Sequence, residues 1–165
     1  MAEIWEIEGR EPTEREKLFA ESRKRMTERV ARYDERLLTV IKNHLGFEDC
    51  LNELLKAASR RWKNRTCAGK IAVGKEINPP EIEKAVWDVV DAGNKLRNAV
   101  AHGHKESVIA TRIAEFRSAH IAALTPQGAK GLKELDDNRA IELAYNFCGA
   151  YMVGAAEGEK ARRKK

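Results

Sequence analysis

The sequence predicts an all-α protein, an antiparallel bundle of helices. Charged residues make up 35% and hydrophobic residues 42% of the 165 positions, with only four prolines, which suits solvated helices better than many short strands. Apolar residues recur every three or four positions, and helix start and stop signals bound these stretches. The length suits one domain, which we expect over residues 1–156, with residues 1–12 as an extension and residues 157–165 as a basic, flexible tail.

The first predicted helix begins at Thr13, because Thr13 and Glu16 have the spacing of a capping box. Gly46 is predicted to end it, and a shorter helix should follow from about Asp49. The apolar face of the first helix comprises Leu18, Phe19, Met26, Val30, Tyr33, Leu37, Ile41 and Leu45. Thr66 is predicted to cap a short third helix.

A basic connector precedes that third helix, because no acidic residue occurs from Leu54 to Lys75. Basic side chains can hold RNA phosphates and an aromatic ring can stack on a base. The RNA-binding candidates are therefore Arg60, Arg61, Trp62, Lys63 and Arg65. The alternative interpretation is a solvated, mobile connector without a ligand.

Asn78-Pro79-Pro80 predicts the start of a long helix that runs to His102 and is ended by Gly103. Its core face comprises Val86, Val89, Val90, Gly93, Leu96 and Val100. Beyond it, residues 107–124 could form a helix, or a short strand followed by a helix, and residues 125–131 a loop. A last helix is expected from Asp136 or Asp137.

Arg97 falls on the apolar face of the long helix, although arginine is rarely buried without a partner. Asn98 and His102 lie side by side along the flank of the same helix. Functional sites are places where such local rules break. The alternative is structural: Arg97 would form an ion pair with a carboxylate across a helix interface, and His102 would merely end the helix.

The segment LRNAVAHGH, Leu96 to His104, resembles the R-x4-H motif of HEPN domains, which are small helical domains of toxin–antitoxin and abortive-infection systems. The resemblance extends over roughly Tyr33 to His104 and implies a metal-independent endoribonuclease without a cofactor. Arg97 and His102 would be its catalytic pair, with Asn98 in support. In the family a dimer brings two motif helices together, so the resemblance also implies a homodimer.

The chemistry suits these residue types. Cleavage of RNA by its own 2′-OH needs a base, an acid and a cation for the charge on the phosphate. Imidazole can serve in both proton transfers and a guanidinium can hold the phosphate. Five positions turn a helix by about 500°, so Arg97 and His102 point about 140° apart on one chain. In the dimer that the resemblance implies, the same geometry would let Arg97 of one chain face His102 of the other.

His104 stands where many toxins of the family have a tyrosine that their antitoxin modifies. An antitoxin protein is thus a partner that the family suggests and this position puts in doubt. His104 is then either a second RNA-contacting, proton-transferring group or a solvated loop residue. A metal site from His102, His104 and Cys67 lacks ligand spacing, so no metal is predicted.

The remaining expectations concern location and the competing functions. The three scattered cysteines indicate reduced thiols, and the absence of a signal peptide or membrane span indicates a cytoplasmic protein. A non-catalytic HEPN-like module that binds a nucleotide or a protein partner would depend on Arg97 alone. A plain helical interaction protein would require the motif to have arisen by chance.

Overall fold

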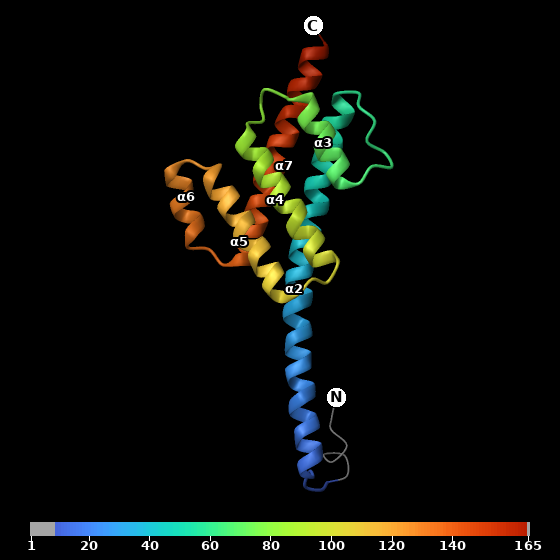
Figure 1. The fold of residues 1–165 in the computed structure, drawn as a ribbon, viewed down its shortest axis with the longest axis vertical. Helices are drawn as coiled ribbons and strands as arrows, with labels where there is room; N and C mark the ends of the chain where they lie inside the picture. The colour runs from blue at the N-terminus through green and yellow to red at the C-terminus, as the bar shows by residue number, and fades with distance from the viewer. Residues whose placement is uncertain (1–8, 165) are drawn as a thin grey trace. The chain divides into compact units, whose positions relative to one another are not determined.

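The computed structural model describes residues 9–164, except for the side chains of residues 32–34, and shows an all-α protein as the sequence predicts (Figure 1). The described elements are α2 (Glu14–Ala57), α3 (Cys67–Ile77), α4 (Lys84–Ala101), α5 (Glu106–Ala122), α6 (Pro126–Lys133) and α7 (Asp137–Arg163). The chain divides into two compact units, residues 1–36 and residues 37–165. All candidate site residues belong to the second unit.

The described part of the first unit consists mainly of the beginning of α2. The predicted capping box is present: the Thr13 backbone N–H donates to Glu16 Oε2 at 2.8 Å, and the Glu16 N–H donates to Thr13 Oγ1 at 3.3 Å. Hydrogen bonds from Arg10 and Thr13 lower the pKa of the Glu16 carboxyl. Leu18, Phe19 and other apolar residues of the predicted face are exposed here. The side chain of Tyr33 lies outside the described residues.

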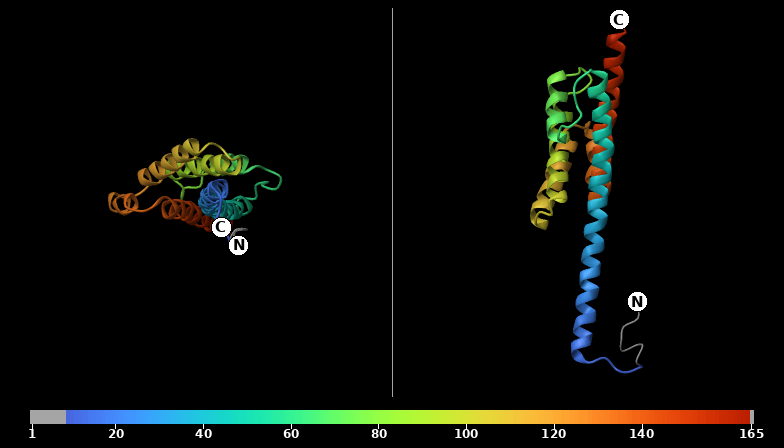
Figure 2. Two further views of the ribbon diagram at one scale, coloured as in Figure 1. Left: turned by 90° about the horizontal axis from the view of Figure 1, so that it is seen from below. Right: turned by 90° about the vertical axis from the view of Figure 1, so that its right-hand side faces the viewer.

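The second unit packs the last part of α2 and α7 on one side and α4 and α5 on the other (Figure 2). Helix α4 contacts α3, α5 and α7. Every position of its predicted core face is buried. The Tyr145 hydroxyl of α7 donates to the Gly93 carbonyl of α4 at 2.8 Å, and its ring lies 4.9 Å from that of Phe116 on α5. One buried tyrosine thus joins the three helices in the core.

Gly46 does not end the first helix, because α2 continues without a break to Ala57. Glycine in a helix interior costs about 1 kcal/mol relative to alanine. The core side chains on both sides of Gly46 outweigh that cost, since Val40, Phe47 and Leu51 are all buried on one continuous face.

Helix α4 begins at Lys84, four residues after the predicted start. Pro79 and Pro80 instead form a turn in which the Ile82 N–H donates to the Pro79 carbonyl at 3.0 Å. The turn follows Asn78, whose φ of 49° ends α3 in the left-handed conformation. The Thr66 cap of α3 is confirmed by its hydrogen bond from the Gly69 N–H at 3.2 Å.

The segment after α4 is helix α5, so the short strand considered for it is absent from the described residues. The loop predicted over residues 125–131 is wrong as well, because helix α6 begins at Pro126. Thr125 caps α6 by accepting a hydrogen bond from the Gly128 N–H, and Leu132 buries its side chain. Helix α7 begins as predicted, capped by Asp136, and extends through Arg163 into the segment predicted as a tail.

Candidate functional site

The R-x4-H segment occupies the end of α4. Arg97 and Asn98 are half-buried in the last turns, and His102 is the exposed residue that follows the helix. Gly103 has a φ of 62°, which favours glycine, and the His104 N–H donates to the Ala99 carbonyl at 3.0 Å. The predicted helix end is therefore confirmed, and it places both histidines at the surface.

Arg97 has no carboxylate partner among the described residues. Its Nη1 donates to the side-chain Oδ1 of Asn98 at 3.2 Å, and its Nε is buried without a hydrogen bond. Among the described residues, Arg97 therefore does not form the ion pair across a helix interface that the structural alternative requires. A half-buried guanidinium without a counter-ion is a costly arrangement unless an anion binds beside it.

The charge of Arg97 acts on three side chains of the surrounding core. Burial, together with the nearby Arg97 charge, lowers the pKa of His44 to about 4. Burial raises the pKa of the Cys67 thiol to about 12 and also raises the pKa of Tyr145, while Arg97 opposes both shifts. Arg97 therefore lies beside three groups that are neutral near pH 7. The Glu48 carboxylate also acts on His44 and Cys67, but its ion pair is with Lys70.

His102 and His104 lie close together, with ring centroids 6.5 Å apart. No hydrogen bond joins Arg97 to His102 within the described chain, as the 140° between them on the helix requires. The structure thus pairs Arg97 with Asn98 and His102 with His104. Within one chain, Arg97 and His102 are therefore not joined to each other directly.

The basic connector is exposed except for its tryptophan. Trp62 packs against the core, and the ammonium groups of Lys63 and Lys70 lie 5.9 Å and 5.7 Å from its ring. Arg60 lies 3.8 Å from Glu76, and the Arg65 Nε donates to the Arg61 carbonyl at 3.0 Å. The four exposed basic side chains can still meet an anionic partner, whereas the Trp62 ring is already in cation–π contact.

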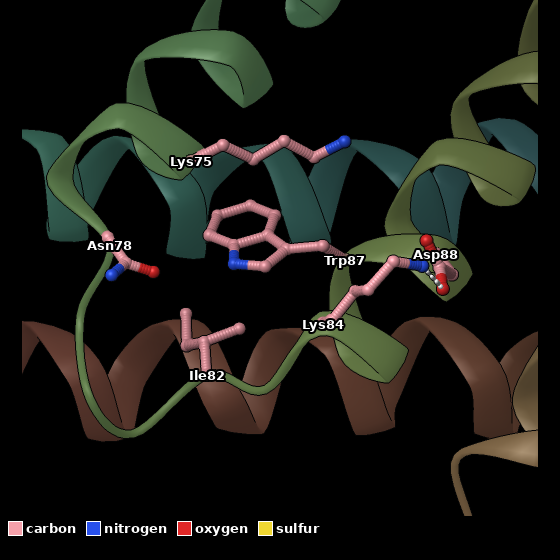
Figure 3. A pocket seen from close by; sticks show the side chains of 6 residues that line it. All are labelled: Lys75, Asn78, Ile82, Lys84, Trp87 and Asp88. Carbon is pink, nitrogen blue, oxygen red and sulfur yellow. Dashed lines mark hydrogen bonds and ion pairs between the residues drawn. The ribbon is translucent and has the colours of Figure 1, made fainter.

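A surface hollow of about 340 Å³ is lined by residues of α3, of α4 and of the connection between them (Figure 3). The indole of Trp87 fills its centre between Lys75 and Ile82. The Lys75 ammonium donates a hydrogen bond to Asp91 at 2.6 Å, and the Lys84 ammonium donates one to Asp88 at 2.7 Å. A carboxylate therefore balances the charge of each ammonium group. None of the predicted site residues lines this hollow.

Sequence reasoning missed a cluster of the buried His44 and the half-buried Glu48 and Cys67, each of which places one ligand-type atom within 4.8 Å of the others. The i, i+4 spacing of His44 and Glu48 was the available signal, because such residues are neighbours on a helix. The contribution of Cys67 could not be read from spacing, since it comes from α3.

No protein-family model, curated protein or solved structure matches the chain. Among the described residues, no helix is both long enough and apolar enough to span a membrane.

Proposed function

We propose that this chain is a metal-independent endoribonuclease of the HEPN type, acting as a toxin or defence enzyme that cleaves RNA through attack of its own 2′-OH. Arg97 holds the scissile phosphate and His102 transfers the protons. Asn98 orients the guanidinium. The exposed basic side chains of residues 60–65, together with His104, contact the RNA. Cleavage of cellular RNA makes an antitoxin protein a natural partner.

The observation that supports this proposal most is the unbalanced charge of Arg97. The half-buried guanidinium has one hydrogen bond to an amide and a buried Nε with no partner among the described residues. A guanidinium offers five N–H donors in a planar fork that matches phosphate. An RNA phosphate would supply the negative charge that the chain itself does not.

A second chain is required to complete the site, because Arg97 and His102 diverge on α4. The apolar face of α4 is covered within the chain, so a partner cannot pack there. The more exposed face instead bears two acidic residues, Asp88 and Asp91, and one basic residue, Lys95, and it leads to Asn98 and His102. We expect two α4 helices to meet along this polar face at their C-terminal ends, where His102 of one chain can reach the exposed part of the half-buried Arg97 side chain of the other.

The direct test is incubation of purified protein with total RNA. Arg97→Ala and His102→Ala should each reduce cleavage by more than about a hundredfold, a typical loss for an acid–base or charge-stabilising group. Arg139→Ala is the matched control, because Arg139 is an exposed arginine on α7 that pairs with Glu142. Circular dichroism checks the fold. Loss of helicity in both motif variants would instead indicate that Arg97 and His102 serve a structural role.

The chemistry has a separate test in the product ends. Attack by the 2′-OH leaves a 2′,3′-cyclic phosphate and requires no metal-bound water. Cleavage should therefore continue in EDTA and without magnesium, with circular dichroism of the same sample separating loss of chemistry from loss of fold. Strict magnesium dependence in a folded protein contradicts the mechanism.

One observation favours a second function, a non-catalytic module that binds a nucleotide or another anionic partner. Arg97 is half-buried and His102 is exposed, so a ligand could be held by Arg97 without approaching His102. In that case, Arg97→Ala would abolish binding while His102→Ala would leave it intact. An equal loss of RNA cleavage in both variants would instead support the endoribonuclease.

A further inference from the structure

The cluster of the buried His44 and the half-buried Glu48 and Cys67 has the composition of a site for a transition-metal ion. It offers one imidazole, one carboxylate and one thiol, and the three ligand atoms lie within 4.8 Å of one another. This combination of nitrogen, oxygen and sulfur ligands suits Zn²⁺, whereas Mg²⁺ and Ca²⁺ prefer oxygen ligands alone.

The local backbone fixes the positions of all three residues. His44 and Glu48 lie one turn apart on α2, with the imidazole Nε2 3.9 Å from the carboxylate Oε2. Cys67 is the first residue of α3, held by the Thr66 cap. Nitrogen and oxygen ligands about 2.1 Å from a tetrahedral zinc are about 3.4 Å apart, so the 3.9 Å between His44 and Glu48 needs to close by about half an ångström. The separations that involve Cys67 are at most 4.8 Å and need to close by no more than about 1.2 Å.

His44 is the observation that points independently to a missing partner. Its side chain is 1% exposed, and neither ring nitrogen has a hydrogen bond among the described residues. A separation of 3.9 Å is too long for a hydrogen bond to Glu48. Buried polar groups in native proteins are nearly always satisfied, and coordination would satisfy one of the two nitrogens.

Glu48 is already oriented for this task. Its Oε1 accepts a hydrogen bond from the Lys70 ammonium at 2.6 Å, which leaves Oε2 directed toward His44. Carboxylates that bind a metal through one oxygen and a protein donor through the other are a recurrent arrangement around metals. Lys70 itself is buried and on α3, one turn after Cys67.

The charges around the cluster also constrain what completes the site. Lys70 and Arg97 are cationic and Glu48 is anionic, so the group carries one net positive charge before any ion binds. A divalent cation with a Cys67 thiolate would raise that by one, the thiol proton passing to solvent. An anion in the fourth position restores the original charge and suits the proximity of Arg97.

We propose that His44, Glu48 and Cys67 bind a zinc-type divalent cation whose fourth position takes an anion. The ion would join α2 to the first turn of α3. The metal ion takes no part in the proposed RNA cleavage, although the charge of Arg97 acts on both sites.

The experiment uses the full chain, freed of metal with a chelator and titrated with Co²⁺ and Zn²⁺. Co²⁺ should produce the near-ultraviolet absorption of a thiolate–cobalt bond, and one equivalent of Zn²⁺ should raise the Tm. Cys67→Ser should remove the thiolate band, and His44→Gln and Glu48→Gln should weaken Zn²⁺ binding at least about tenfold. Cys50→Ser is the matched control, since Cys50 is a second half-buried cysteine on α2.

Three results would overturn the proposal. The first is a folded wild-type protein that binds neither ion at micromolar concentration. The second is a cobalt band that survives in Cys67→Ser or disappears in Cys50→Ser. The third is Zn²⁺ binding that is lost in His104→Ala but kept in Cys67→Ser, which would assign the ion to the exposed histidine pair after α4. Circular dichroism of each variant ensures that lost binding is not lost fold.

Discussion

The Arg97 Nη1 donates a hydrogen bond to the side chain of the next residue, Asn98, at 3.2 Å. This is the one protein acceptor that the guanidinium has among the described residues, and it is a neutral amide. The contact can therefore orient the guanidinium but cannot balance its charge. That distinction separates an arginine prepared for an anionic ligand from an arginine that serves the core.

Asn98→Ala should reduce RNA cleavage by about tenfold, because a hydrogen bond to a charged group contributes about 1.5 kcal/mol and about 1.4 kcal/mol corresponds to a factor of ten. Asn98→Asp should reduce it further, since the new carboxylate would pair with Arg97 and compete with phosphate. Single-turnover cleavage rates measure both. If the aspartate variant cleaves as fast as wild type, an unbalanced Arg97 is not needed for activity.

Gly74→Ala should destabilise the protein by about 1–3 kcal/mol, the usual cost of overpacking a core. A Cβ at Gly74 would lie 2.7 Å from the Cη2 atom of Trp87, whose indole fills the centre of the hollow in Figure 3. Gly46→Ala is the matched control in α2, because its Cβ would meet nothing within 4 Å. It should stabilise the protein by about 0.5–1 kcal/mol. Urea unfolding of both variants tests the prediction, and equal effects of the same sign contradict it.

Stability should fall as the pH decreases below the ordinary histidine pKa of 6.5, partly because of His120. Burial lowers the pKa of this imidazole in the folded protein. Below about pH 6.5 the unfolded chain therefore binds a proton that the folded chain does not, so the free energy of unfolding declines with acidification. His120→Gln should show a smaller loss between about pH 7 and about pH 5. The dependence should not vanish, because burial lowers the pKa of His44 as well. An unchanged slope in urea unfolding would exclude His120.

The sequence predicted those parts of the fold that local signals determine. The caps at Thr13, Thr66 and Asp136 and the helix end at Gly103 are all present, because each depends on residues within a few positions. The prediction that Gly46 ends the first helix was wrong because it too depended on a local signal. Its local signal indicated a stop, whereas the buried face on either side of it, which forms only on packing, continues the helix.

The candidate site could likewise be predicted from the sequence only in part. Periodicity alone placed Arg97 on the core side of α4, and the structure agrees. What the pattern could not supply was the absence of a carboxylate beside it, because the neighbours His44, Cys67 and Tyr145 come from three other helices. The cluster of His44, Glu48 and Cys67 could not be predicted for the same reason, because its residues come from two different helices.

The final prediction concerns the composite site, in which each cleft takes Arg97 from one chain and His102 from the other. Arg97→Ala and His102→Ala are then inactive alone but complement each other in a mixed dimer. One cleft of that dimer lacks both residues, whereas the other retains both. Co-refolding equal amounts should make half of the dimers mixed, with one good cleft each, and restore about a quarter of wild-type cleavage.

The control for this experiment is Arg97→Ala co-refolded with the double variant Arg97→Ala/His102→Ala. This mixture contains no intact Arg97, so it should recover no cleavage. Recovery should also depend on assembly along the polar face of α4. Adding a reversed charge there, Lys95→Glu, should weaken the dimer and cleavage together without altering helicity, because Lys95 is exposed on that face. Light scattering measures the dimer. A strictly monomeric protein that still cleaves RNA at nanomolar concentration would show that one chain suffices.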